Sequence, residues 1–273
     1  MTTTVSRHAD ARSFLLAAEE WLNEKEVEHN VVLSVAHLLT GKHHFKEPIF
    51  LGTVETAGQV SGCILLPPPD GLYLTTLPLE ATGDIERALR QHYRSIREVT
   101  GPESVITEFA RRWSPDKWAL RTRLRWYSLE SPIRQDHGAA GSFRQAGDRD
   151  LPVLDEWAPV FAAEFGTLVD VRMLFRTMMR RGLLHLWDDG GPKCVISVSG
   201  LTPTAARISS LYTPAEFRRR GYAASAVAAA GAWIFDSGRR LCVVSADIDA
   251  PGPNAIFRQA GFRPGEEFAV IHL

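Results

Sequence analysis

The same order of secondary-structure elements is predicted twice along the chain, and this repeat restricts the fold more than any single motif does. Apolar residues at helical or alternating spacing give each half two helices, a hairpin and a third strand, followed by helix, strand, helix and strand. In the first half, helices are expected over 11–41 (two), 84–98 and 108–118, and strands over 48–55, 59–66, 71–77, 103–107 and 120–129. In the second half, helices are expected over 151–165, 169–181, 221–236 and 254–260, and strands at 143 and over 183–187, 193–199, 207–212, 241–246 and 268–272. We therefore expect an α/β (α+β) fold with two similar domains in tandem, each a mixed, mostly antiparallel sheet flanked by helices.

The polar segment at 131–141 indicates a domain boundary. At about 100–200 residues per domain, a chain of 273 residues fits two ordinary domains as easily as one large one, and we expect two. Residues 131–141 contain a proline and two glycines and follow neither the helical nor the strand period. We expect the first domain to cover residues 1–135 and the second to cover residues 136–273.

Charge and cysteine content exclude several classes of partner. The net charge of −1 provides no general attraction for nucleic acid or an anionic membrane. The three cysteines, Cys63, Cys194 and Cys242, are far apart and form no CxxC pair, which favours a reducing compartment. The N-terminus lacks the apolar run of a signal peptide, and the mostly alanine stretch over 222–235 is shorter than the roughly 20 residues that span a membrane. We expect a cytoplasmic protein that contacts neither membranes nor nucleic acid.

The segment after the third strand differs between the halves. In the second half it contains Arg218, Arg219, Arg220 and Gly221 before an alanine-rich helix, whereas residues 78–84 of the first half contain no arginine. A glycine there lets successive backbone N–H groups converge on an anion, and the helix adds its free N–H groups and the positive end of its dipole. The alternative is a basic surface loop that caps a helix. Neither a Walker motif nor GxGxxG is present, so the segment indicates a diphosphate ligand other than a nucleoside triphosphate or a nicotinamide cofactor.

Residues 207–264 resemble the acetyl-CoA-binding core of the GNAT superfamily of N-acetyltransferases. Its R/Q-x-x-G-x-G/A signature falls on Arg218, Gly221 and Ala223, and its N-A-I-Y-x-x-x-G-F/Y segment falls on 254–262. The rest of the chain is similar to longer bacterial members with a degenerate GNAT-like first half. The resemblance therefore implies two GNAT-like domains in tandem, of which residues 1–135 lack the cofactor loop and residues 136–273 bind acetyl-CoA or another acyl-CoA.

The resemblance also implies a set of site residues. The loop at 218–224 binds the CoA diphosphate, the backbone of the third strand pairs with the pantetheine arm, and three helix residues flank the thiol end. The acceptor, a small molecule or a peptide with an amine, enters over the helices of 151–181, between the two halves. The implied cofactor-binding residues are Ser210, Leu211, Tyr212, Thr213, Arg218, Arg219, Arg220, Gly221, Tyr222, Ala223, Ala224, Asn254, Phe257 and Arg258.

Phe257 departs from the family pattern, and the second half offers several carboxylates as a base. GNAT enzymes often have a tyrosine at this position, whose hydroxyl protonates the leaving thiolate, and a phenyl ring cannot do so. Tyr212, Tyr222 or a water are substitutes, and a thiol with a reference pKa of about 8.5 also leaves without such help. The family often uses a carboxylate or a water chain as the base. The candidate here is Glu164, followed by Asp170, Glu216 and Asp247, each of which also fits a surface charge or a helix cap.

Three functions remain open: an N-acetyltransferase with direct attack of the amine, a non-catalytic acyl-CoA-binding or regulatory protein, and an enzyme that transfers a different acyl group. No serine or cysteine is paired with a histidine as nucleophile and base, which favours direct attack. His37, His43, His44 and Glu47 lie close in sequence but lack the spacing of a metal motif, so no metal is expected. Trp113, Trp118 and Trp126 are expected in the core or an interface. The sequence indicates neither the acceptor nor the oligomeric state.

Overall fold

The computed structural model describes residues 3–41, 49–67, 71–132, 138–166 and 169–273. The chain forms two compact units, of which the first contains residues 1–126, 245–250 and 265–273 and the second contains residues 127–244 and 251–264. The C-terminal residues belong to the first unit because β12 (Arg263–His272) pairs antiparallel with β5 (Glu98–Gly101). The expected boundary at residues 135 and 136 lies outside the described residues.

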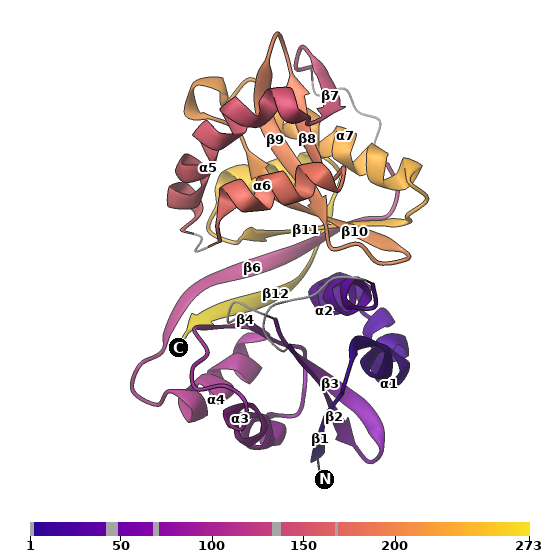
Figure 1. Ribbon diagram of the computed structural model, residues 1–273, viewed down its shortest axis with the longest axis vertical. Coiled ribbons are helices and arrows are strands. Elements are labelled where there is room, and N and C mark those ends of the chain that lie inside the picture. Colours follow the sequence, from indigo (N-terminus) through magenta and orange to yellow (C-terminus); the bar gives the residue numbers. More distant parts are fainter. Residues whose placement is uncertain (1–2, 42–48, 68–70, 133–137, 167–168) are drawn as a thin grey trace. The chain divides into compact units, whose positions relative to one another are not determined.

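The first unit consists of a mixed sheet with a pair of helices on each face. Its strand order is β1-β2-β3-β4-β5-β12-β6, with β4 and β5 parallel. Figure 1 shows α1 and α2 side by side, and α3 and α4 together on the other side of the strands. The elements are β1 (Thr3–Arg7), α1 (Ala11–Asn23), α2 (Glu26–Leu39), β2 (Phe50–Thr56), β3 (Gln59–Leu66), β4 (Gly71–Leu74), α3 (Thr82–Arg90), α4 (Glu103–Trp113) and β6 (Ala119–Leu129).

Alternating residues of β3 separate the two cores of this unit. Cys63 and Leu65 pack with the α1 and α2 side chains, whereas Ile64 and Leu66 pack with those of α3 and α4. This period of two is what a strand buried on both faces requires.

The second unit repeats the chain order of the first: strand, two helices, three strands, helix, strand, helix. Its strand order is β11-β10-β9-β8-β7, with β10 and β11 parallel. Helices α5 and α6 pack on one face and α7 on the other (Figure 1). The elements are β7 (Ser142–Gln145), α5 (Leu151–Phe165), α6 (Val171–Arg180), β8 (Leu184–Asp188), β9 (Pro192–Ser199), β10 (Ala205–Tyr212), α7 (Tyr222–Asp236), β11 (Leu241–Asp247) and α8 (Pro251–Gln259). The expected α+β class and the tandem repeat are confirmed.

The prediction around residue 103 was wrong. Residues 103–107, expected as a strand, form the start of α4, and the strand of this region is β5 at 98–101. Val105, Phe109 and Trp113 are buried at a spacing of four residues, which is the repeat of a helix face. The expected helix over 84–98 ends at Arg90, and the strand β1 was not expected.

Candidate functional site

The segment between β10 and α7 has the backbone conformation that an anion site needs. Gly221 has a φ of 82° and Arg219 a φ of 61°, so both are left-handed. The helical hydrogen bonds of α7 begin with the N–H of Ser225, which donates to the carbonyl oxygen of Gly221 at 3.0 Å. The N–H groups of residues 222–224 precede it at the positive end of the helix dipole. A non-glycine residue such as Arg219 adopts this conformation at a cost, and such strain is concentrated at functional sites.

A cavity of about 560 Å³ opens at this helix terminus, and all its walls belong to the second unit. Four segments form it: the end of α5, the end of β10, the loop with the start of α7, and one face of α8. The lining residues are Glu164, Phe165, Leu211, Tyr212, Thr213, Phe217, Arg218, Arg219, Gly221, Tyr222, Ala223, Ala224, Gly252, Pro253, Ile256 and Gln259.

The structure brings most of the expected cofactor residues to this cavity. Those that line it are Leu211, Tyr212, Thr213, Arg218, Arg219, Gly221, Tyr222, Ala223 and Ala224. Those outside its lining are Ser210, Arg220, Asn254, Phe257 and Arg258. Phe165 and Phe217 line it without having been expected, because neither belongs to a motif and only the tertiary fold brings them to the site.

Helix α8 presents a different face to the cavity from the one the motif suggested. Ile256 and Gln259 line the cavity, whereas Asn254 and Phe257 are buried on the opposite side against Tyr127 of β6. The hydroxyl of Tyr127 donates to Oδ1 of Asn254 at 2.5 Å, and the rings of Tyr127 and Phe257 are 5.8 Å apart. The side chain of Phe257 is thus part of the core, with 3% of its surface exposed.

A β-bulge interrupts β10 next to the cavity. Its register with β9 shifts between Ile208 and Leu211, and the amide of Ser210 donates to Oγ of Ser197 at 3.0 Å instead of following the regular ladder. Pairing of β10 with β11 covers Ala205–Arg207 in the described part of the chain. Bulges of this kind commonly lie beside active sites, where they redirect backbone groups.

One ion pair lies within the cavity lining, between Arg218 and Glu164. A terminal nitrogen of Arg218 lies 2.7 Å from the carboxylate of Glu164, and Nε of Arg218 donates to the carbonyl oxygen of Thr213 at 2.8 Å. Burial and the negative charge of Glu164 raise the pKa of Tyr212. The hydroxyl of Tyr222 donates to Asp189 at 2.7 Å, and this bond raises the pKa of Tyr222.

The other candidate bases lie outside the cavity lining. Asp170 accepts a bond from the amide of Met173 at 3.0 Å and so caps α6. Asp247 belongs to the first unit and accepts a bond from the hydroxyl of Thr122 at 2.6 Å. Glu216 is exposed on the loop.

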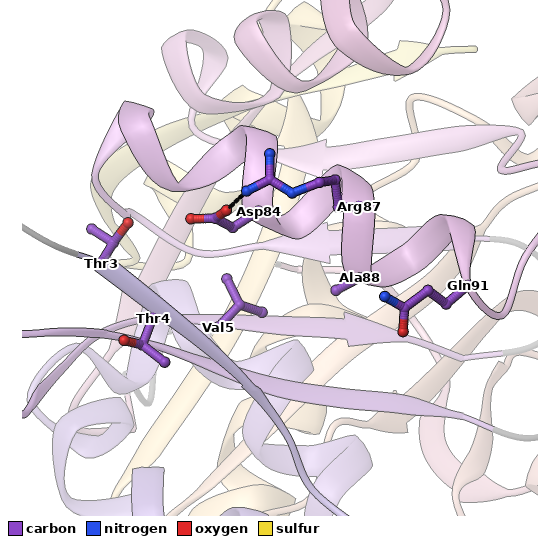
Figure 2. A pocket seen from close by; sticks show the side chains of 7 residues that line it. All are labelled: Thr3, Thr4, Val5, Asp84, Arg87, Ala88 and Gln91. Atoms are coloured by element: carbon purple, nitrogen blue, oxygen red, sulfur yellow. Dashed lines mark hydrogen bonds and ion pairs between the residues drawn. The ribbon is translucent and has the colours of Figure 1, made fainter.

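A depression in the first unit lies between β1 and α3 rather than at the end of the third strand. This polar depression of about 330 Å³ is lined by Thr3, Thr4, Val5, Asp84, Arg87, Ala88 and Gln91 (Figure 2). Figure 2 shows the guanidinium of Arg87 turned toward the carboxylate of Asp84, with which it forms an ion pair. Among the described residues that line this depression, Asp84 and Arg87 are the charged ones, and they neutralise each other.

The remaining expectations concern groups away from the cavity. His37 pairs with Glu19 at 3.0 Å, while His43, His44 and Glu47 lie outside the described residues. No metal-binding cluster occurs in the described part of the chain, and none of the helices described there is long and apolar enough to cross a membrane. Trp113 and Trp126 are buried as expected.

Several solved structures with the same fold carry the name of GNAT or GCN5-related acetyltransferases. A tandem GNAT protein from the clavulanic acid biosynthesis pathway is 14% identical, with a TM-score of 0.58 over 100% of this chain and 98% of its own. A GCN5-related N-acetyltransferase from Sphaerobacter thermophilus is 16% identical, with a TM-score of 0.56 over 99% of this chain and 95% of its own. A Drosophila protein is 9% identical, with a TM-score of 0.69 over 100% of this chain and 99% of its own.

No protein-family model matches the sequence, and no curated protein matches it. At these identities the likeness concerns the fold, and this chain has the fold of a tandem GNAT protein over its full length.

Proposed function

We propose that the chain is an acyltransferase that moves an acetyl group from acetyl-CoA to an amine, with the cofactor bound in the cavity of the second unit. The observation that carries the proposal is the coincidence of that cavity with the left-handed turn at Arg219 and Gly221 and the N-terminus of α7. The proposed domain roles are an acetyl-CoA-binding domain over 136–273 and a domain without a cofactor loop over 1–135.

The residues present fit a CoA molecule. The amides of 222–224 suit a diphosphate, since they are donors at the positive end of a helix. Arg219 lies at the same turn and adds positive charge. The backbone of β10 beyond Arg207 is no longer paired with β11 in the described residues, so it provides an edge for the amide groups of a pantetheine arm.

The proposed reaction needs no covalent intermediate between the acetyl group and the protein. Acetyl-CoA supplies a thioester, whose carbonyl carbon a neutral amine can attack directly. The backbone N–H near Leu211, at the bulge, is placed to donate to an oxygen that gains negative charge. A hydroxyl at the position of Phe257 is absent, so proton donation to the thiolate falls to Tyr212, Tyr222 or water. The pKa values of both tyrosines are raised, which keeps their hydroxyls protonated.

The burial of Phe257 favours a second candidate, a protein that binds acyl-CoA without turning it over. Its ring packs on Tyr127 and Phe262, so a hydroxyl added by Phe257→Tyr would enter the core rather than the cavity. Turnover of acetyl-CoA with any amine of a broad panel, detected as free thiol, separates the enzyme from the binding protein. Mass spectrometry of an acyl-CoA retained on purification identifies an acyl group other than acetyl.

Calorimetric titration with acetyl-CoA tests the proposed site. We expect Gly221→Glu to abolish binding, because the new side chain is strained at a positive φ and adds negative charge where the diphosphate binds. Gly238→Glu is the matched control, since Gly238 is also left-handed, at a φ of 87°, but lies at the opposite end of α7 with open space around its Cβ position. Equal binding by both variants, or none by the wild type, contradicts the proposal.

A further inference from the structure

Glu164 and Arg218 form an ion pair inside the lining of the cavity. Both oxygens of the Glu164 carboxylate are 2.7 Å from Nη2 of Arg218. The two side chains come from α5 and from the loop before α7, and they are 39% and 42% exposed. The pair is therefore accessible to a ligand that enters the cavity.

The guanidinium of Arg218 is held by more than this carboxylate. Its Nε donates to the carbonyl oxygen of Thr213, and its centre lies 6.0 Å from the centre of the Tyr212 ring. Both of these partners also line the cavity. The guanidinium consequently lies beside the end of β10, where the proposed pantetheine edge meets the diphosphate loop.

We propose that Glu164 acts as an internal anion that neutralises Arg218 and competes with the diphosphate of CoA, so that this carboxylate lowers the affinity of the site. The inference rests on the proposed function of the same cavity. Two effects act in one direction: an entering diphosphate must replace the carboxylate at Nη2, and the carboxylate repels the ligand's negative charge across the cavity. Arg218 is thereby kept oriented for the ligand before the ligand arrives.

This role differs from that of a general base. A base must be available to a proton of the amine near the thiol end, whereas both oxygens of Glu164 face a guanidinium in the loop that would hold the diphosphate. A base assignment predicts that Glu164→Gln lowers turnover and leaves the affinity for CoA unchanged. Competition predicts that the same substitution tightens binding.

Titration of the full chain with acetyl-CoA in a calorimeter distinguishes these roles. For Glu164→Gln we expect the dissociation constant to fall about three- to tenfold at low salt, from the loss of an exposed ion pair and of the repulsion. The gain should shrink above about 0.5 M salt, where the Debye length is only a few ångström. In the Arg218→Gln variant, Glu164→Gln should increase the affinity for acetyl-CoA by less, because the guanidinium for which the carboxylate and the diphosphate compete is absent.

Asp155→Asn is the matched control. Asp155 also lies on α5 and pairs with an arginine, Arg176 of α6, at similar exposure, but it lies outside the cavity lining. We expect its affinity for acetyl-CoA to equal that of the wild type. An unchanged or weaker affinity for Glu164→Gln, or an equal gain for Asp155→Asn, overturns the inference while the proposed function stands. A wild type that does not bind acetyl-CoA overturns the proposed function itself.

Discussion

Replacing Ser197 by alanine should disturb the β-bulge beside the cavity. Oγ of Ser197 accepts the bond from the amide of Ser210 and shares a second bond with the hydroxyl of Ser209 at 2.8 Å. Ser197 is 1% exposed and Ser210 is 5% exposed, so water has little access to the amide once its partner is removed. A buried amide that loses its partner costs about 1–3 kcal/mol of stability.

The functional consequence concerns the orientation of the next amide along the strand. Ser210 directly precedes Leu211, whose N–H is proposed to face the thioester oxygen, so a bulge that relaxes should move this donor. We expect Ser197→Ala to lower the free energy of unfolding by about 1–3 kcal/mol and to lower turnover more than the affinity for acetyl-CoA. Reversible urea unfolding and calorimetric titration measure the stability and the affinity on the same preparations.

Ser199→Ala provides the comparison. The Ser199 hydroxyl donates to Oγ of Ser209 at 3.0 Å and belongs to the same group of hydroxyls, but the amide of Ser210 bonds to Ser197. We expect its stability to stay within about 0.5 kcal/mol of the wild type, as for most substitutions near the surface. If the two alanine variants lose equal stability, the amide bond of Ser210 is not what stabilises the bulge, and the reasoning fails.

Two further predictions concern the first unit. Gly101→Ala should destabilise it by more than about 2 kcal/mol, because the new Cβ would lie 2.3 Å from the carbonyl oxygen of Leu74. The control is Gly58→Ala. Gly58 has a positive φ but open space around its Cβ position, so this substitution should lower the melting temperature less. Burial lowers the pKa of His29 from 6.5 to about 4. The folded state therefore binds a proton less readily than the unfolded chain, and stability should fall by up to about 3 kcal/mol as the pH drops from 6.5 toward 4; His29→Asn should reduce this loss in urea titrations at both pH values.

The parts of the site that the sequence predicted are those with local causes. The left-handed turn at Gly221 and the alanines at the start of α7 follow from residues adjacent in the chain, and the structure places them together. The rotation of α8 has a distant cause: Tyr127, more than a hundred positions earlier, covers the face that carries Asn254 and Phe257. No pattern within α8 reveals that partner.

The same distinction explains the errors in the fold. The apolar pair Val105 and Ile106 alone fits a strand or a helix. The helical repeat that continues to Trp113 identifies a helix only if the helix is taken to begin directly after Pro102. The pairing of β12 with β5 joins segments about 170 positions apart, and short-range periodicity carries no information about such a pairing. Structure that depends on neighbouring residues could thus be predicted from the sequence, whereas the pairing of segments far apart in the chain could not.

A comparison of α3 with α7 explains why equivalent positions in the two halves should differ in function. Both helices follow the third strand of their half, but α3 begins with buried Thr82 and Gly83 and carries Asp84 in its first turn. A carboxylate there interacts favourably with the helix dipole and repels a second anion. In the second unit the first turn of α7 has no acidic residue, and the carboxylate that lines the cavity, Glu164, comes from another helix. Asp84 pairs with Arg87 of its own helix, whereas the proposed role of Glu164 requires that a ligand displaces it. We therefore expect an internal anion to be exchanged for an external diphosphate at α7 and not at α3.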